Sequence, residues 1–308
     1  MAYKILITPR SFSQSSEVAR QMLLDKGYEL LNNPYDRIMS KEEMKELIKD
    51  VDGVILGVDP FDKEIIQAAE KLKVISRYGV GLDNIDIDYA KQLDIPVLRT
   101  VGANSDAVAD YAFGLMLDLT RKITFIDKEC RKGNWKKIKT SEMNNKIIGI
   151  IGLGAIGKGV AKRALGFDMN VLAFDLFKDD DYAKANHVKY TDLETIYKTA
   201  DFISIHLPLN EDTHHMIDYK EFEMMKKTTI LVNTARGGIV NEDALYDALK
   251  NHKIMAAGVD VFETEPPKNL MLMELDNLIV GAHCAASSNE AIDNMSLMAA
   301  QNLIKALA

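Results

Sequence analysis

The chain has 308 residues, of which 47% are hydrophobic and 27% are charged, and its formal net charge is −8 at pH 7. Its length favours two domains over a single core, and its apolar runs are shorter than a membrane span. Without a basic block it lacks the electrostatic footprint of a nucleic-acid or anionic-membrane binder, so we expect neither partner.

The first residues, MAYKILITPR, enter an apolar strand-like segment directly. They lack the basic lead, long apolar stretch and cleavage site of a secretory signal. Cys130 and Cys284 form no disulfide framework, and neither has neighbouring ligands at the spacing of a metal site. We therefore expect a cytoplasmic protein with reduced thiols and no metal.

Short apolar runs alternate with charged amphipathic stretches through the N-terminal third. The expected strands are KILIT (4–8), YELL (28–31), GVILG (53–57), KVISRY (73–78) and IPVLRT (95–100). This alternation predicts a parallel sheet with crossover helices. Ser40 and Glu43 have the spacing of a capping box ahead of KEEMKELIKD, which predicts a helix there.

A proline-free apolar stripe from Asn104 to about Gly133 predicts a long helix that crosses into a second domain. A second alternating series begins at Lys146. Its expected strands are KIIGII (146–151), VLAFD (171–175), FISIHL (202–207), TILVN (229–233), MAAGVDV (255–261) and NLIVGA (277–282). Six strands are typical of a doubly wound nucleotide-binding sheet. The tail after Ser287, with Glu290 at capping-box spacing, predicts a final helix that packs on the first domain.

The stretch GLGAIG places Gly152, Gly154 and Gly157 between the strand KIIGII and the helical segment KGVAKRALGF. In this setting the first glycine allows a tight turn, the second lets a pyrophosphate approach the backbone, and the third lets helix and strand pack closely. The helix N-terminus would then face the phosphates.

Asp175 ends the next strand, where an acidic residue can accept hydrogen bonds from the adenosine ribose hydroxyls. A 2′-phosphate would meet a like charge there, so we predict NAD rather than NADP, although Lys178 is close in sequence. The simpler alternative is a glycine-rich turn beside a solvated aspartate.

Arg236, Glu265 and His283 each follow the carboxyl end of a predicted strand, which is the edge where open α/β sheets bind ligands. An arginine can hold a carboxylate through two parallel hydrogen bonds, and a histidine can supply a proton near neutral pH. A carboxylate bonded to that imidazole would stabilise its protonated form. Together they predict hydride transfer between a nicotinamide and C2 of a small 2-hydroxy or 2-keto acid.

Each of the three has a structural alternative when it is taken alone: a packed histidine, an arginine at a helix cap or a solvated glutamate. Their common place at the sheet edge, downstream of the glycine motif, favours catalysis. His206 is expected either to shape the cofactor pocket or to be a buried structural residue. We assign no chemistry to the remaining histidines, which are His187, His214, His215 and His252.

The chain resembles the D-isomer-specific 2-hydroxyacid dehydrogenases, and within them the phosphoglycerate dehydrogenase-like branch. The likeness covers essentially the whole chain. Its matching blocks are SRYGVGLDNID (76–86), GANSDAVADYA (102–112), KIIGIIGLGAIGK (146–158), HLPLN (206–210), LVNTARGGIVNEDAL (231–245) and GVDVFETEPP (258–267).

The resemblance implies a flavodoxin-like α/β substrate domain built from both chain ends, 1–101 and 285–308, and an NAD-binding Rossmann domain at 102–284. It implies that Arg236, Glu265 and His283 are catalytic, and it also implies a homodimer. Substrate-side residues would be Tyr78, Gly79, Val80, Asn104 and Arg236. Besides the three glycines and Asp175, residues near the dinucleotide would be Ala155, Ile156, Leu207, Pro208, Thr213, Thr234, Ala235 and Asp260.

Two departures from the family pattern bear on the expected activity. The block GAHCAASS (281–288) lacks the usual proline before the histidine, so we expect a looser loop around His283. The block VILGVDPFD (54–62) lacks an arginine that some phosphoglycerate dehydrogenases use, and no regulatory domain is expected after Ala308. Phosphoglycerate is therefore one candidate substrate, with Arg77 as either an extra cation for phosphate or a structural salt bridge.

Two other functions fit the same motifs. One is an NAD(H)-sensing protein like the co-repressors of this family, and the other is a dehydrogenase of formate, phosphite or another small anion.

Overall fold

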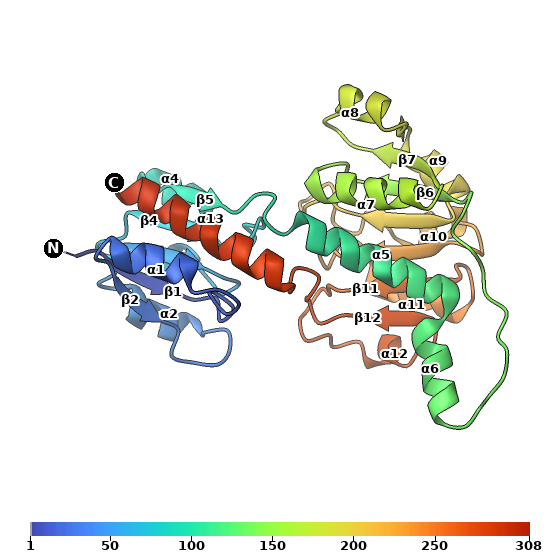
Figure 1. Ribbon diagram of the computed structural model, residues 1–308, viewed down its shortest axis with the longest axis horizontal. Coiled ribbons are helices and arrows are strands. Elements are labelled where there is room, and N and C mark those ends of the chain that lie inside the picture. Colours follow the sequence, from blue (N-terminus) through green and yellow to red (C-terminus); the bar gives the residue numbers. More distant parts are fainter. Residues whose placement is uncertain (1) are drawn as a thin grey trace. The chain divides into compact units, whose positions relative to one another are not determined.

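A computed structural model describes residues 2–308 of the chain. The chain forms two compact units. The terminal unit comprises the chain up to Asn104 together with Ala286–Ala308, and the central unit is Ser105–Ala285. Each unit contains one parallel β-sheet with helices between its strands (Figure 1), which confirms the predicted α/β class.

The terminal unit contains a five-stranded parallel sheet in the order β2-β1-β3-β4-β5. All five predicted strands form, and they are β1 (Lys4–Ile7), β2 (Glu29–Asn32), β3 (Gly53–Leu56), β4 (Val74–Arg77) and β5 (Val97–Arg99). Its helices are α1 (Val18–Asp25), α2 (Lys41–Ile48), α3 (Lys63–Ala68), α4 (Ile87–Gln92) and α13 (Asn289–Leu307). Helix α13 packs on α1 and on β3, β4 and β5.

The two predicted capping boxes have different outcomes. The box of Ser40 and Glu43 forms at the start of α2, as predicted. The box at Ser287 is wrong by one residue, because the N-cap of α13 is Ser288, whose extended backbone lets its side chain accept from Ala291 N. That register leaves Glu290 outside a capping box.

The central unit contains a seven-stranded parallel sheet in the order β12-β11-β10-β9-β6-β7-β8. Its strands are β6 (Ile147–Ile151), β7 (Asn170–Phe174), β8 (Lys189–Tyr190), β9 (Phe202–Ile205), β10 (Ile230–Asn233), β11 (Ala256–Val259) and β12 (Leu278–Val280). The six predicted strands all form, and β8 is an additional edge strand. The chain builds outward from β6 to one edge and then returns to β9, so the strand order reverses between β6 and β9.

Helices cover both faces of the central sheet. They are α5 (Ser105–Arg121), α6 (Ile123–Arg131), α7 (Ala155–Gly166), α8 (Asp180–Ala185), α9 (Leu193–Thr199), α10 (Tyr219–Met224), α11 (Glu242–Lys250) and α12 (Leu270–Met273). The prediction of one helix from Asn104 to Gly133 is wrong, because Lys122 has φ 54° and separates α5 from α6. Asp118 stabilises the break, since its Oδ1 accepts from Thr124 N at 2.8 Å.

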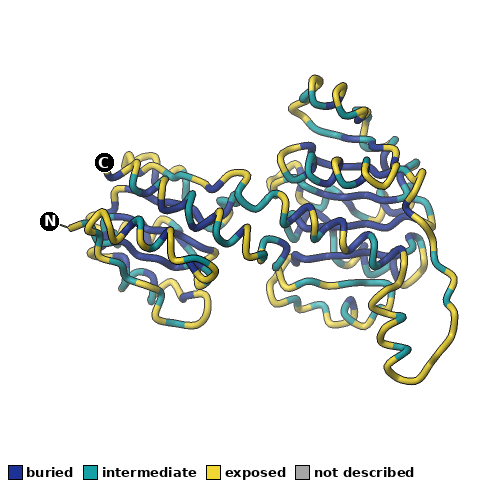
Figure 2. Tube along the Cα trace, viewed as in Figure 1, coloured by how far each residue is buried: buried dark blue, intermediate teal, exposed yellow. Residues whose placement is uncertain are grey.

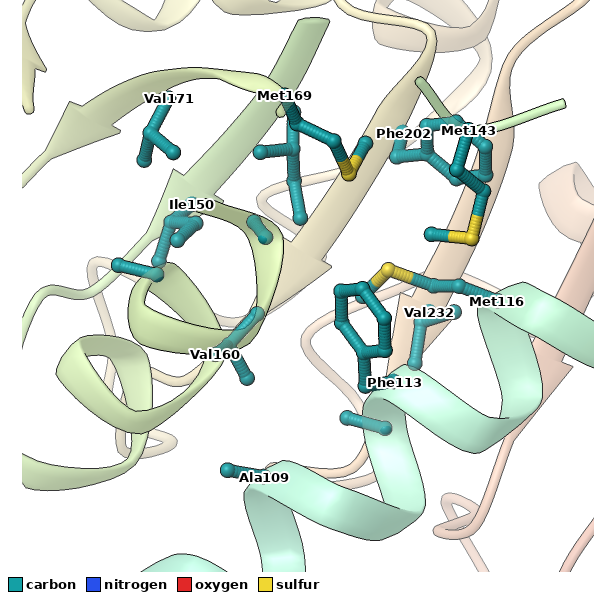
Figure 3. Close-up of a cluster of buried hydrophobic side chains, with 14 of the residues drawn as sticks. Ala109, Phe113, Met116, Met143, Ile150, Val160, Met169, Val171, Phe202 and Val232 are labelled. Atoms are coloured by element: carbon teal, nitrogen blue, oxygen red, sulfur yellow. The ribbon is translucent and has the colours of Figure 1, made fainter. Parts of the chain in front are cut away.

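The trace of the central unit is mostly buried along the inner strands of its sheet (Figure 2), and the buried side chains form two clusters, one on each face of the sheet. On one face Phe113 and Met116 of α5 and Val160 of α7 pack on Ile150 and Val232 (Figure 3). On the other, helices α9, α10 and α11 supply the buried layer. Burying each such side chain contributes about 1.5–3 kcal/mol, so the sheet is a rigid support for the loops at its edge.

Candidate functional site

Loops that follow neighbouring strands meet at the carboxyl edge of the central sheet. Gly152 follows β6, His206 follows β9, and Thr234 comes directly after β10. Asp260 comes directly after β11, and the loop to His283 follows β12. The edge includes the point between β6 and β9 where the strand order reverses, which is where open α/β sheets bind their ligands.

The glycine motif has the geometry that its spacing predicts. Gly152 has φ 97°, and a Cβ there would lie 2.7 Å from the carbonyl oxygen of His206. A Cβ on Gly157 would lie 2.1 Å from Gly152 O, whereas one on Gly154 would meet nothing within 4 Å. The first and third glycines are therefore required by the protein's own packing, and the second leaves open space. Gly154 also caps α7 without a side-chain acceptor, so the first N–H groups of α7 are free to bind an anion.

Asp175 links the strand β7 to the glycine loop. Its Oδ2 accepts from Leu153 N at 2.7 Å and its Oδ1 from Phe177 N at 2.8 Å. A carboxylate has about four acceptor positions, so both oxygens keep capacity for ribose hydroxyls. The ammonium of Lys178 lies 5.6 Å from the ring centroid of Tyr190.

Two buried polar atoms at this edge have no hydrogen-bond partner within residues 2–308, namely Nδ1 of His206 and Oγ1 of Thr234. His206 bonds to Ser204 Oγ through Nε2 at 2.8 Å, and burial lowers the pKa of His206 to about 3. This imidazole is therefore neutral near pH 7 and is no proton donor. Unsatisfied buried polar groups carry an energetic cost that a bound ligand can remove, so both atoms fit a site for a dinucleotide.

The other residues expected near the dinucleotide lie in loops at the same edge. Ala155 and Ile156 open α7, and Leu207 and Pro208 follow His206. Thr213 holds this second loop together, because its Oγ1 donates to Pro208 O at 2.7 Å and accepts from Asn210 N at 2.8 Å. Ala235 N donates to Asn233 Oδ1 at 3.0 Å.

The three candidate catalytic residues lie together. His283 Nδ1 is 2.8 Å from Glu265 Oε2, while Glu265 Oε1 accepts from Phe262 N at 3.1 Å. Burial alone would raise the pKa of Glu265, but the hydrogen bond and charge of His283, the Phe262 N–H and the charge of Arg236 together lower it. Glu265 is therefore ionised at neutral pH. The carboxylate accepts from Nδ1, so the other imidazole nitrogen is left for a substrate.

Arg236 follows β10 in a turn that Asn233 shapes. The side chain of Asn233 donates to Arg236 O at 2.9 Å, and the Arg236 guanidinium donates through Nη1 to Ala235 O at 2.7 Å. The effect of its charge on Glu265 places the guanidinium near the His283–Glu265 pair. The arrangement brings together a guanidinium, an imidazole and a carboxylate that accepts from the imidazole.

Three hydrogen bonds to Asp260 hold the loop around His283, where the sequence lacks the family's usual proline. Asp260 has a relative exposure of 1% and accepts from Cys284 N at 3.0 Å and from Ala285 N at 2.8 Å. Its carbonyl accepts from His283 N at 2.8 Å. These bonds fix His283 in a left-handed conformation with φ 53°. The thiol of Cys284 lies 3.4 Å from the Tyr111 hydroxyl.

Of the expected substrate-side residues, Tyr78, Gly79 and Val80 follow β4 in the terminal unit, and Asn104 is in the same unit after β5. Tyr78 is buried and donates to Ile292 O at 3.2 Å, and burial raises the pKa of its hydroxyl. Gly79 has φ 132° and donates to Thr100 Oγ1 at 2.8 Å. Val80 is half-buried, and Asn104 has a buried Oδ1 without a hydrogen-bond partner in residues 2–308.

Arg77 is buried and stabilises the loop that follows β4 through hydrogen bonds. Its guanidinium donates to the carbonyl oxygens of Leu56 at 3.1 Å, Tyr78 at 2.7 Å and Gly81 at 2.7 Å. The sequence left two roles open for Arg77, as an extra cation for a substrate phosphate or as part of a structural salt bridge. These backbone contacts favour a structural role.

One residue near the site was missed. No chemistry was assigned to His215, but its Nε2 lies 3.0 Å from Glu263 Oε1. Glu263 belongs to the block 258–267, but the two residues are far apart in sequence and no local spacing connects them. Over residues 2–308 no cluster of three potential metal ligands occurs, and no helix is long and apolar enough to cross a membrane.

Comparison with known proteins agrees with this arrangement. Residues 113–285 match the pattern described as D-isomer specific 2-hydroxyacid dehydrogenase, NAD binding domain. The chain is 39% identical over 295 residues to the hydroxypyruvate reductase of Thermotoga maritima, with 94% of each chain covered. It is 40% identical over 273 residues to the glyoxylate reductase of Korarchaeum cryptofilum, covering 86% of this chain and 82% of that one.

A solved structure is similar along nearly the whole chain. The D-lactate dehydrogenase of Aquifex aeolicus, complexed with NAD and lactic acid, superposes with a TM-score of 0.86 at 30% identity. The match covers 98% of this chain and 95% of that protein.

Proposed function

Because the chain belongs to the D-isomer-specific 2-hydroxyacid dehydrogenase family, we propose that it reduces a small unphosphorylated 2-keto acid, such as glyoxylate or hydroxypyruvate, to the 2-hydroxy acid. Family membership makes it an NAD-dependent oxidoreductase acting on CH–OH groups. The observation that carries the proposal is the 2.8 Å bond between His283 and Glu265, beside Arg236.

Arg236 binds the substrate carboxylate and orients C2, since a guanidinium can make two parallel hydrogen bonds to it. NADH, held by the glycine loop, Asp175, His206 and Thr234, would supply the hydride for C2. His283 donates the proton to the carbonyl oxygen through Nε2, because Nδ1 is held by Glu265. Glu265 keeps the imidazole oriented and stabilises its charged form. In the oxidative direction His283 accepts the proton again.

The case for an unphosphorylated substrate comes from Arg77. This guanidinium is 7% exposed and donates to three backbone carbonyls, so it is committed to the loop that follows β4. The neighbouring segment 57–62 has the sequence GVDPFD and supplies two carboxylates but no cation. A phosphate would be poorly stabilised by these residues.

We assign NAD binding to the central unit, through the glycine loop, Asp175, His206 and Thr234. We assign the substrate-side residues Tyr78, Gly79, Val80 and Asn104 to the terminal unit.

The protein is further proposed to be a cytoplasmic homodimer. In support of the dimer, no residue of α6 is buried, and Ile123, Phe125 and Trp135 are 53%, 41% and 86% exposed. Such an apolar surface is typical of an interface. The cytoplasmic location is proposed because two cysteines in 308 residues form no disulfide framework of the kind common in secreted proteins. Light scattering of the wild type and a Trp135→Glu, Phe125→Glu variant tests the dimer: the variant should be monomeric, and a monomeric wild type would contradict it. Cell fractionation tests the location.

The experiment that tests the activity is NADH oxidation with glyoxylate, hydroxypyruvate, pyruvate and phosphohydroxypyruvate. We expect turnover with the unphosphorylated acids and a much lower kcat/KM for phosphohydroxypyruvate. A preference for the phosphorylated acid would contradict the substrate assignment. Tight NADH binding without turnover of any keto acid would contradict the reductase and favour an NAD(H) sensor.

A further inference from the structure

The loops that carry Arg236 and Glu265 touch where there is no space for a side chain. Gly237 follows Arg236, and a Cβ on Gly237 would lie 1.9 Å from Phe262 O and 2.6 Å from Glu263 N. Two peptide groups therefore lie directly against each other between the two candidate catalytic residues. The rigidity of this contact between the two loops therefore bears on the position of the Arg236 guanidinium relative to the His283–Glu265 pair.

Three side chains surround the junction, and we call His215, Glu242 and Glu263 the His–Glu cluster. His215 Nε2 bonds to Glu263 Oε1 at 3.0 Å, and because a carboxylate only accepts, the imidazole N–H is the donor. Glu263 Oε1 also accepts from Glu242 N at 3.4 Å, and Glu242 Oε1 accepts from Glu263 N at 2.6 Å. The main chain of His215 donates to Gly238 O at 2.7 Å. His215 thus binds the Arg236 turn through its backbone and the Glu265 loop through its side chain.

Other charged and titratable groups face the cluster. The His214 ring stacks on His215 with centroids 3.9 Å apart. Burial, followed by the charges of Glu263 and Asp243, raises the pKa of Glu242, although the hydrogen bond from Glu263 N opposes this. The cluster therefore gathers negative charge, and the imidazole N–H of His215 is the side-chain donor that Glu263 accepts from.

The simplest alternative to a functional role is that His215 and Glu263 form an ordinary surface ion pair. The side chains of His215 and Glu263 are 32% and 40% exposed, and such pairs typically contribute less than about 1 kcal/mol to folding. Their position distinguishes them. His215 follows β9 and bonds to both of the loops whose peptides are in contact, through its main chain to Gly238 and through its side chain to Glu263.

We propose that His215 is a positioning residue, which sets the spacing between Arg236 and the His283–Glu265 pair by holding Gly238 and Glu263 together. The inference rests on the proposed roles of Arg236 and His283. The keto acid would be held at its carboxylate by Arg236 and protonated by His283, so its rate of reduction is sensitive to the separation of these two side chains. NADH binding is assigned to the glycine loop, Asp175, His206 and Thr234, and no hydrogen bond of the His–Glu cluster involves these residues, so we expect it to be unaffected by this spacing.

The kinetic test uses His215→Ala, Glu263→Ala and the double variant, with hydroxypyruvate as substrate. Each single variant should lower kcat/KM for the keto acid roughly fivefold or more while the KM for NADH is unchanged. The double variant should be no worse than either single, because both remove the same contact. His215→Gln should recover part of the loss, since an amide N–H can donate to Glu263. Glu223→Ala, which breaks an exposed ion pair with Lys253 in the same unit, is the matched control and should leave kcat/KM unchanged.

A second measurement is independent of activity. Amide hydrogen exchange in segments 236–242 and 262–265 should be faster in His215→Ala and in Glu263→Ala than in the wild type. If the wild type is active but His215→Ala has the wild-type kcat/KM, or if the losses in the double variant are additive, the positioning role is wrong. If the wild type turns over no keto acid, the proposed function fails, and exchange rates equal to wild type in both variants would then overturn the cluster as well.

Discussion

The contact between His283 and Glu265 gives a quantitative prediction for the rate of the reaction. Glu265→Gln keeps an oxygen that can accept from His283 Nδ1 but removes the negative charge. The Nδ1–Oε2 distance is 2.8 Å, which corresponds to charge centres about 4 Å apart. Two charges at that separation interact by about 1 kcal/mol in water and by about 4 kcal/mol at the effective dielectric near a protein surface.

Solvent screening lowers this range. The side chains of His283 and Glu265 are 45% and 38% exposed, so about 1–1.5 kcal/mol is the appropriate magnitude. That energy corresponds to roughly tenfold in rate. The direction follows from the charge: without the carboxylate the imidazole of His283 loses its charged partner. The kcat/KM for keto-acid reduction should therefore fall roughly tenfold.

The assay is the initial rate of NADH oxidation with hydroxypyruvate across the pH range, for the wild type and Glu265→Gln. NADH affinity, measured separately by fluorescence, should be equal in the two proteins. Equal kcat/KM values in the two proteins would show that Glu265 does not assist the proton donor, and the reasoning would then be refuted.

Three further predictions concern the cofactor edge. Gly154→Ala should keep the wild-type Tm but weaken NADH binding, because its Cβ enters the open space expected for the cofactor. Gly157→Ala should lower the free energy of unfolding by about 1–3 kcal/mol, because its Cβ meets Gly152 O. Calorimetry and NADH titration distinguish the two variants, and equal stabilities would contradict the packing argument. Asp175→Ala should weaken NADH binding more than NADPH binding, and an unchanged ratio of the two Kd values would contradict the ribose assignment. The pKa of His206 is lowered to about 3, so folding stability is lost as the pH falls from about 6.5 toward that value, by about 1.4 kcal/mol per pH unit. His206→Gln should flatten this dependence of stability on pH, measured by urea unfolding. An equal slope in the variant would contradict the burial of His206 in its neutral form.

Most of the sheet framework was predictable, because buried parallel strands are continuous apolar runs. All eleven predicted strands form, while β8 was missed since Lys189 and Tyr190 give no apolar run at the sheet edge. The break at Lys122 was also missed, because a left-handed residue other than glycine or asparagine has no sequence signal. The N-cap of α13 was placed one residue early because two serines stand side by side.

The candidate site was predictable to the extent that it depends on strand ends. Arg236, Glu265 and His283 could be chosen because residues after parallel strands share one edge. The parts of the site that depend on tertiary contacts were not predictable from the sequence. The hold of Asp260 on the His283 loop and the bond from His215 to Glu263 join loops that are distant in sequence, and nothing local marks either one.

The claim that His283 is the proton donor beside Arg236 is tested most directly by one comparison of His283→Gln with the wild type. The measurement is kcat/KM for hydroxypyruvate at saturating NADH, together with the Kd for NADH. The predicted result is a loss of about 10²-fold or more in kcat/KM with an unchanged Kd. A variant that reduces hydroxypyruvate at the wild-type rate would contradict the account.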